Sequence, residues 1–295
     1  MKGDLHCHTR LSDGSEGIEE VISRGKRAGM DFLAITDHDT VASMSRAKVL
    51  ADRYGVQVIP GVEFSSRDPK TGRKVHVLCY LPEKPDRLEG LCVRLCESRK
   101  KAGRAMIQKL TRYFPVSVED VLRFSKHSTA IYKQHIMHAL MCYGYTTHIF
   151  GGLYHELFDP KTGVLLSKVE YPEVDEVIDL IHQAQGLAVL AHPYEYDSID
   201  LMKRLVSEEK LDGIEVYPQP VPPGKRRLFK TGSTGTRPDY DRRIGFSRLL
   251  CLPTQPDWEP VHFAGIVRRT VPCQGTETPG LQIELQQERN VFRWT

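Results

Sequence analysis

The chain has 295 residues, with 41 Lys and Arg against 38 Asp and Glu, and a formal net charge of +3. This small charge, with both signs interspersed, gives no electrostatic reason to expect a stable nucleic-acid partner. The seven cysteines are odd in number and scattered, unlike the disulfide framework of a small secreted protein. No apolar run approaches the ~18 residues of a membrane span, and the first residues lack the apolar segment of a signal peptide. We therefore expect a cytoplasmic protein without a membrane partner.

Up to Leu81 the sequence alternates between strand-like and helix-like patterns. Short apolar segments typical of strands lie at 4–9, 31–38, 56–65 and 74–81. Amphipathic segments lie at 15–30 and 39–55. Ser15 and Thr40 mark the expected helix starts, and Gly29 and Gly55 the expected ends. This alternation predicts βαβ units and a parallel sheet.

Beyond Pro82 the pattern becomes helical. One long amphipathic helix is predicted over 86–114, with shorter ones at 117–125 and 133–145. We interpret residues 83–170 as a helical insertion. The alternation then resumes, with helices expected at 173–186 and 198–210 and strands at 187–193 and 211–217.

The first candidate site residues lie in the opening segment "DLHCHT". Side chains two residues apart on a strand point to the same side, so His6 and His8 can bind one ion together. The alternative is a pair of polar residues at a strand end.

Further imidazole and carboxylate groups lie at or near the expected C-terminal ends of other strands. They are His38, Glu63, His76 and His192, with Asp13 close to the first strand. In a parallel barrel these ends converge on one face. Any one of them could be a hydrogen-bonded core residue, but together they would leave many buried polar atoms unsatisfied without cations. Mixed nitrogen and oxygen ligands suit Zn²⁺, Mn²⁺ or Fe, and Mg²⁺ is possible.

The segments "DLHCHTRLSDG", "AITDHDT", "GVEFS" and "LAHP", with the strand that holds His76, resemble the PHP (polymerase and histidinol phosphatase) family over residues 1–217. The resemblance is to its metal-dependent phosphoesterase branch, typified by nucleoside 3′,5′-bisphosphate phosphatases. It implies an α/β fold, a distorted seven-stranded (β/α) TIM-like barrel, interrupted by the insertion. It also implies two to three divalent metal ions, with Glu63 bridging two of them. The implied ligands are His6, His8, Asp13, His38, Glu63, His76 and His192.

The same resemblance implies that cationic groups of the insertion hold the phosphate of the substrate. The candidates are Arg99, Arg104, Lys133 and His135, each of which could instead be a solvated group on a helix face. The family usually has Arg where Lys133 stands, which puts two-point binding of the phosphate in question.

The expected activity is hydrolysis of small phosphate esters, above all nucleotides, by a metal-bound hydroxide and without a protein nucleophile. A histidinol-phosphate phosphatase and a 5′→3′ exonuclease on short oligonucleotides are alternatives. A further one is an inactive barrel that binds only metal or nucleotide.

The last 78 residues, 218–295, do not match the family. They contain more than half of the 18 prolines and both tryptophans, and lack the late "GSDFHG"-like motif that carries two more family ligands. Codons allowed for Arg242 to Arg248, read one nucleotide later, encode Gly-Gly-Ser-Asp-Phe-His-Gly. We therefore hypothesise a frameshift shortly after Tyr217 that loses or scrambles the last strand. The alternative is a genuine basic C-terminal domain that binds RNA or a phosphorylated partner.

Overall fold

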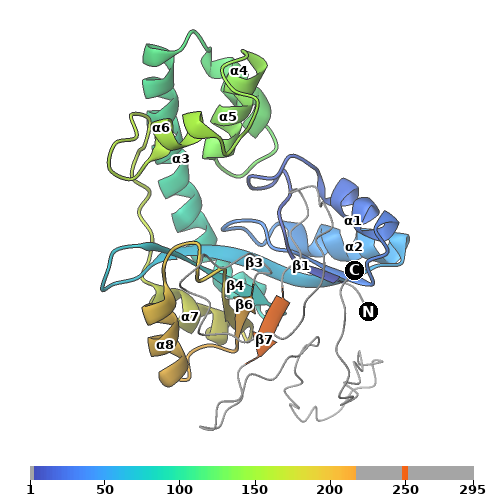
Figure 1. The fold of residues 1–295 in the computed structure, drawn as a ribbon. Coiled ribbons are helices and arrows are strands. Elements are labelled where there is room, and N and C mark those ends of the chain that lie inside the picture. Colours follow the sequence, from blue (N-terminus) through green and yellow to red (C-terminus); the bar gives the residue numbers. More distant parts are fainter. Residues whose placement is uncertain (1–2, 217–247, 252–295) are drawn as a thin grey trace, which may run out of the picture.

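The structure is a computed structural model that describes residues 3–216 and the backbone of residues 248–251 (Figure 1). The rest of the tail, with the shifted motif, lies outside the described residues. The mixed α/β prediction is confirmed, since helices flank a curled sheet. Its strands are β1 (Gly3–Cys7), β2 (Phe32–Ile35), β3 (Gln57–Arg67), β4 (Lys74–Tyr80), β5 (Leu187–Leu190), β6 (Gly213–Val216) and the short edge strand β7 (Arg248–Cys251).

The prediction of a parallel sheet is correct only for part of it. β1, β2 and β3 are parallel, as are β5 and β6, but β4 runs antiparallel to both of its neighbours. The reason is the connection from β3 to β4. It is a tight turn in which the Asp68 carboxylate accepts the Lys70 N–H at 3.0 Å and Gly72 adopts a φ of +68°. A turn this short can join only antiparallel strands.

Closure of the sheet into a barrel is not seen among the described strands. The strand order is β1-β2-β3-β4-β5-β6-β7, so β1 pairs only with β2, and the other edge of β6 pairs with β7. The concave interior is apolar and includes Ala34, Ile59, Leu78 and Val189. The described strands therefore form a half-barrel whose interior is filled by apolar side chains.

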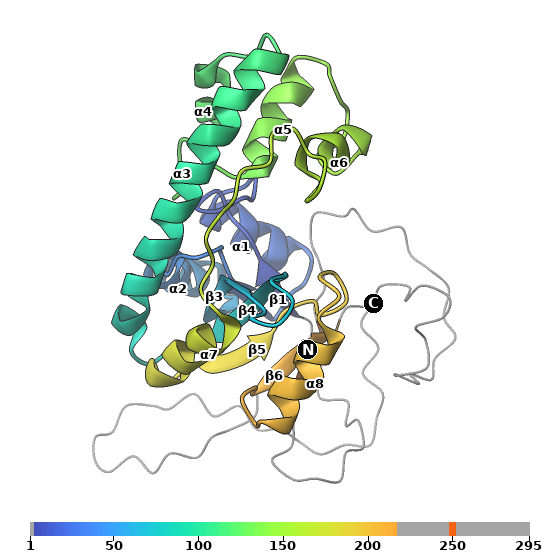
Figure 2. The same cartoon turned by 90° about the vertical axis from the view of Figure 1, so that its left-hand side faces the viewer.

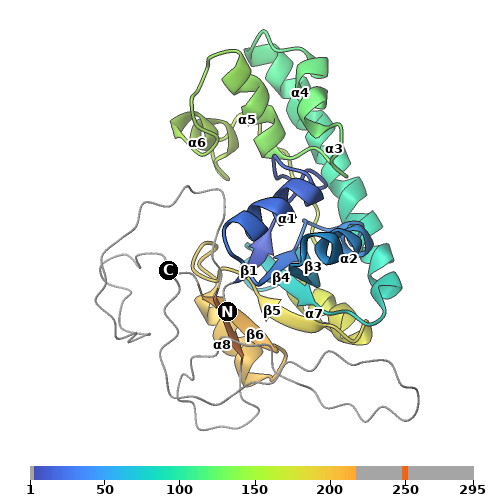
Figure 3. The ribbon, with the colours of Figure 1, turned by 90° about the vertical axis from the view of Figure 1, so that its right-hand side faces the viewer.

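Four helices cover the outside of this sheet (Figures 1 and 3). Beside β1 to β3 lie α1 (Ile18–Arg27) and α2 (Ser43–Tyr54), and beside β4 to β6 lie α7 (Val174–Gln183) and α8 (Ile199–Ser207). The predicted stop at Gly55 is confirmed, since this residue caps α2 with a φ of +62°. No helix of the described residues is long and apolar enough to cross a membrane.

Between β4 and α7 the chain forms a separate helical layer on one side of the sheet (Figure 2). It consists of the 3-10 turn η1 (Pro85–Leu88), α3 (Glu89–Tyr113), α4 (Val118–Ser125), α5 (Lys133–Cys142) and α6 (Gly152–Phe158). The helix α6 is not among the helices that the sequence pattern predicts. The helices share a core of their own that includes Leu110, Val121, Ile136 and Leu165. The long helix α3 extends from this layer to the sheet (Figure 2), and its Arg99 contacts Asp39 and Ser65.

Candidate metal centre

The site is built around one buried carboxylate, Glu63 on β3, which is 1% exposed. Three imidazole nitrogens surround its Oε2. Nε2 of His6 lies at 3.2 Å, Nε2 of His8 at 3.2 Å and Nδ1 of His38 at 3.0 Å. As the alternation of β1 predicts, His6 and His8 face the same side, with ring centroids 5.0 Å apart.

Two more imidazoles approach the other oxygen of this carboxylate. Nδ1 of His76 lies 2.7 Å and Nε2 of His192 lies 2.9 Å from Glu63 Oε1. These two nitrogens are themselves 3.2 Å apart. The structure therefore brings five of the predicted ligands to the sixth.

The placement of His76 corrects one expectation. This residue is not at the C-terminal end of its strand, because β4 is antiparallel and places its N-terminal half at the site, with His76 opposite Ser65. The side chain of His76 still reaches the cluster. Side chains alternate between the two faces of the sheet in either strand direction, and the reversed direction brings the N-terminal half of β4 to the site.

Asp13, the seventh predicted ligand, lies at the edge of the cluster. Its Oδ1 is 3.4 Å from His8 Nδ1, and its Oδ2 is 3.7 Å from His38 Nε2. The amide of Gln134, on α5, donates to Asp13 Oδ2 at 2.8 Å. The insertion thus contacts the edge of the cluster directly.

The donor set fits bound divalent cations. Two groups of donor atoms are each compact enough to hold an ion, His6 with Glu63 and His192, and His8 with His38 and Glu63. Within the described chain, the buried atoms His76 Nε2 and His192 Nδ1 have no hydrogen-bond partner, and His38 Nδ1, although 3.0 Å from Glu63 Oε2, forms no hydrogen bond either. One carboxylate cannot satisfy five imidazoles, and buried polar atoms without partners are costly. Glu63 belongs to both groups.

The electrostatics keep the central carboxylate ionised. Burial by itself would raise the pKa of Glu63, but the imidazoles of His38, His76 and His6 outweigh burial and hold it well below its usual range. Burial, the largest influence on His38, lowers the pKa of that imidazole well below its ordinary value. The Glu63 carboxylate is therefore ionised, which is the state of a carboxylate that binds metal.

Glu215 on β6 is a site residue that the sequence analysis missed. It is 1% exposed and lies 2.9 Å, through Oε1, from Nδ1 of His6. Its Oε2 accepts the backbone N–H of His192 at 3.0 Å. The signal in the sequence is a single acidic residue in the otherwise apolar segment "GIEV".

Arg99 reaches the strand ends from α3 and is 7% exposed. Its Nε donates to Asp39 Oδ2 at 2.6 Å, and its Nη2 donates to Ser65 Oγ. Its guanidinium carbon lies 4.8 Å from the ring centroid of Tyr132. Burial would lower the pKa of Arg99, but Asp39 and the two neighbouring tyrosines, Tyr171 and Tyr132, raise it well above its usual range. The charge is thus permanent, and two of the three nitrogens are engaged.

Lys133 and His135 begin α5. The Lys133 ammonium lies 5.4 Å from the ring of Phe158, and burial, with the charges of Lys74 and Arg99, lowers its pKa to about 8. His135 Nδ1 accepts the Tyr132 N–H at 3.1 Å, which leaves Nε2 as the donor of the neutral ring. Burial lowers the pKa of His135 to about 4, so the ring is neutral at pH 7.

Two further cationic residues, Arg104 and Lys74, differ in their relation to the cluster. Arg104 is exposed on α3, and none of the hydrogen bonds, ion pairs or ring contacts within the described residues joins it to the cluster. Lys74, which the sequence analysis did not name, lies over the rings of Tyr171 at 5.7 Å and Tyr196 at 5.5 Å. Tyr196 in turn contacts the ring of His76 at 5.1 Å between centroids. Lys74 is therefore a cation at the cluster.

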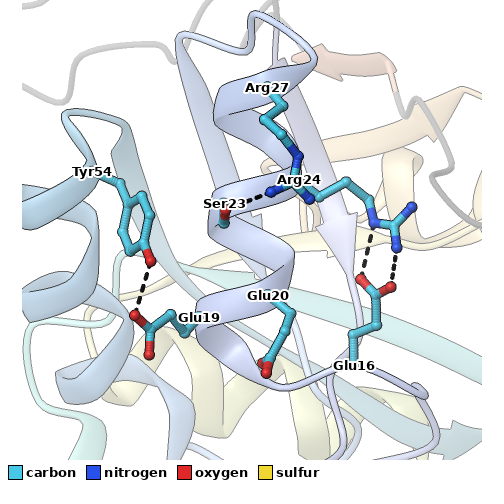
Figure 4. Close-up of a pocket in the computed structure, with 7 residues that line it drawn as sticks. All are labelled: Glu16, Glu19, Glu20, Ser23, Arg24, Arg27 and Tyr54. Carbon is cyan, nitrogen blue, oxygen red and sulfur yellow. Dashed lines mark hydrogen bonds and ion pairs between the residues drawn. The ribbon is translucent and has the colours of Figure 1, made fainter.

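A surface hollow beside α1 and α2 is unrelated to this site (Figure 4). Several of its polar groups bond to one another. Arg24 pairs with Glu16, and the Tyr54 hydroxyl donates to Glu19 at 2.8 Å. None of the predicted metal ligands lines it.

Comparison with known proteins agrees with this geometry. The PHP domain model matches residues 4–217. The chain is 38% identical over 219 residues to a phosphoribosyl 1,2-cyclic phosphate 1,2-diphosphodiesterase of Eggerthella lenta, covering 74% of this chain and 83% of that protein. It is 30% identical over 221 residues to a 3′,5′-nucleoside bisphosphate phosphatase of Chromobacterium violaceum, covering 72% and 75%.

Among solved structures, a Bifidobacterium adolescentis protein described as a metal-dependent phosphoesterase superposes with a TM-score of 0.66 at 26% identity, covering 73% of this chain and 77% of that one. The sequence match, the shared fold and the histidine cluster around Glu63 point to the same conclusion. The chain belongs to the PHP domain family.

Proposed function

We propose that this chain is a metal-dependent phosphoesterase that hydrolyses phosphate esters of nucleotides and related small molecules. The observation that carries the proposal is that Glu63 is shared by two compact groups of metal donors. Divalent ions held there would supply Lewis-acid chemistry, since they neutralise phosphoryl oxygens and acidify water. By the same geometry, His6 and His192 would bind one ion and His8 and His38 the other, which differs from the expectation that His6 and His8 bind one ion together.

Cationic and hydrogen-bonding groups beside the cluster support binding of a phosphate. Arg99 and Lys133 are held near the cluster, and Lys74 adds a third positive charge. His135 presents Nε2–H as a neutral donor. These groups would bind and orient the phosphoryl oxygens, and the adjacent ring of Tyr196 would exclude water.

The comparisons favour two substrate types. The bisphosphate phosphatase of Chromobacterium violaceum supports a nucleoside bisphosphate. The higher identity to the Eggerthella lenta enzyme supports a ribose cyclic phosphate as the second candidate. Both substrates combine a pentose with phosphate esters, and each can be offered separately.

The test is phosphate release from a matched panel by the chain loaded with Mn²⁺ or Zn²⁺. The panel contains adenosine 3′,5′-bisphosphate, phosphoribosyl 1,2-cyclic phosphate with ring opening followed by phosphorus NMR, histidinol phosphate, and a 5′-phosphorylated oligonucleotide with nucleotide release as the readout. Hydrolysis of either of the first two supports the proposal. Metal loading without hydrolysis of any compound would favour the inactive barrel.

A further inference from the structure

The buried carboxylate of Glu215 lies beside the proposed metal centre, and both of its oxygens are engaged. Oε1 is 2.9 Å from Nδ1 of His6, and Oε2 accepts the backbone N–H of His192 at 3.0 Å. Neither of the two compact donor groups among the described residues includes Glu215. Glu215 is thus placed beside the ligands of the first group, His6 and His192.

The bond to Nδ1 fixes how the ring of His6 is used. An ionised carboxylate only accepts hydrogen bonds, so Nδ1 carries the proton in this pair. Nε2, on the opposite side of the ring, then faces Glu63 at 3.2 Å. Carboxylates that hold the second nitrogen of a metal-binding histidine in this way fix the orientation and basicity of the ring.

The second oxygen of Glu215, Oε2, bonds to His192, whose backbone conformation is unusual. His192 has a φ of +26°, outside the regions that a non-glycine residue ordinarily occupies. The hydrogen bond from its N–H to Glu215 helps to hold this conformation, in which His192 Nε2 lies 2.9 Å from Glu63. One side chain thus positions both histidines of the first donor group.

The bond also joins parts of the sheet that are not paired. Within the described strands, no ladder connects β1 with β6, yet the His6 to Glu215 bond spans them. The side chains of His6 and Glu215 are 5% and 0% exposed, so water does not compete for this bond.

We propose that Glu215 is a positioning residue that assembles the His6, Glu63 and His192 group for one of the two ions, and leaves the His8, His38 and Glu63 group unaffected. This inference rests on the proposed function, because it assumes that these donors bind metal. Substitution of carboxylates in such positions typically weakens metal binding about 10- to 100-fold. The effect should therefore fall on one ion.

The test is titration of the metal-free full chain with Mn²⁺, followed by calorimetry and by electron paramagnetic resonance. Glu215→Gln keeps the size of the side chain but has only one acceptor oxygen. Its NH₂ group would face either the His6 Nδ1–H or the His192 N–H, so one of the two hydrogen bonds is lost. We expect one Mn²⁺ binding step to weaken about 10- to 100-fold and the other to change less than about twofold. Glu215→Asp keeps the charge but retracts it, and should have the same selective effect if Glu215→Gln does not fold.

The matched control is Asp68→Asn, a buried carboxylate in the β3 to β4 turn that bonds to Lys70 and Thr71. It should leave both Mn²⁺ steps unchanged. Wild-type affinities in both Glu215 variants would overturn the inference. So would equal weakening of both steps together with a lower melting temperature, which is the signature of a merely structural role. If either of these two outcomes is found while the wild type still releases phosphate, only the inference on Glu215 is overturned and the proposed function stands. A wild-type chain that binds no Mn²⁺ overturns both the inference and the proposed function.

Discussion

At the scale of single residues, Lys133 gives a pH-dependent prediction. Its pKa is lowered to about 8 by burial and by Lys74 and Arg99, so the ammonium loses its charge as the pH rises through 8. A neutral amine attracts phosphate less, so KM should rise above pH 8 and stay level below about 7. Lys133→Met should raise KM at pH 7 and flatten this dependence.

The measurement is KM from pH 6.5 to 9.5 for the wild type, Lys133→Met and Lys100→Met. Lys100 is a partly exposed lysine on α3 that pairs with Glu97, so its variant should follow the wild type. Parallel profiles for all three proteins would show that Lys133 does not contact the phosphate.

At the scale of secondary-structure elements, Gly103 fixes how α3 packs on the segment before α5. A Cβ at Gly103 would lie 2.6 Å from Ile131 Cβ and 3.2 Å from the Ile131 carbonyl oxygen. Gly103→Ala should therefore destabilise the protein by about 1–3 kcal/mol, although alanine is the better helix former. It should also displace Tyr132, which contacts Arg99.

The matched control is Gly90→Ala in the same helix, where a Cβ has no neighbour within 4 Å. This variant should be neutral or gain up to about 1 kcal/mol. Denaturant unfolding compares the two variants. Equal free energies of unfolding would mean that Gly103 does not limit the contact.

The elements also show what the sequence could reveal. The alternation correctly located β1 to β3, because each pair is joined by a helix whose period differs from that of a strand. The direction of β4 was missed, because periodicity contains no information on direction and the turn at Asp68 decides it. Glu215 was missed because its partners, His6 and His192, are distant in sequence and only the fold brings them together.

At the scale of the whole molecule, bound metal should stabilise the fold. The cluster joins residues from β1, β3, β4 and the loops after β2 and β5, and three of its buried ring nitrogens have no hydrogen-bond partner within the described chain. A ligand at 100 times its Kd stabilises by about 2.7 kcal/mol. Chelation should therefore lower the melting temperature by several degrees, and Mn²⁺ should restore it. A melting temperature that does not respond to the chelator would contradict metal binding.

The tail provides a second prediction at this scale. A base inserted or missing just after Tyr217 would return the Gly-Ser-Asp-Phe-His sequence at its expected distance from β6. Sequencing of the coding DNA from Gly213 to the stop codon checks this directly. A frame that stands as written would leave the chain without the last two family ligands and would favour the inactive barrel.

By our proposal, Glu63 holds the ions that make the chain a phosphoesterase. The most direct measurement is metal content and phosphate release, side by side, for the wild type, Glu63→Gln and the control Glu173→Gln, whose exposed carboxylate pairs with Arg67. We predict that the wild type and the control bind divalent metal and release phosphate, and that Glu63→Gln loses metal and at least about 100-fold in activity. Undiminished metal content and phosphate release in Glu63→Gln would contradict the account.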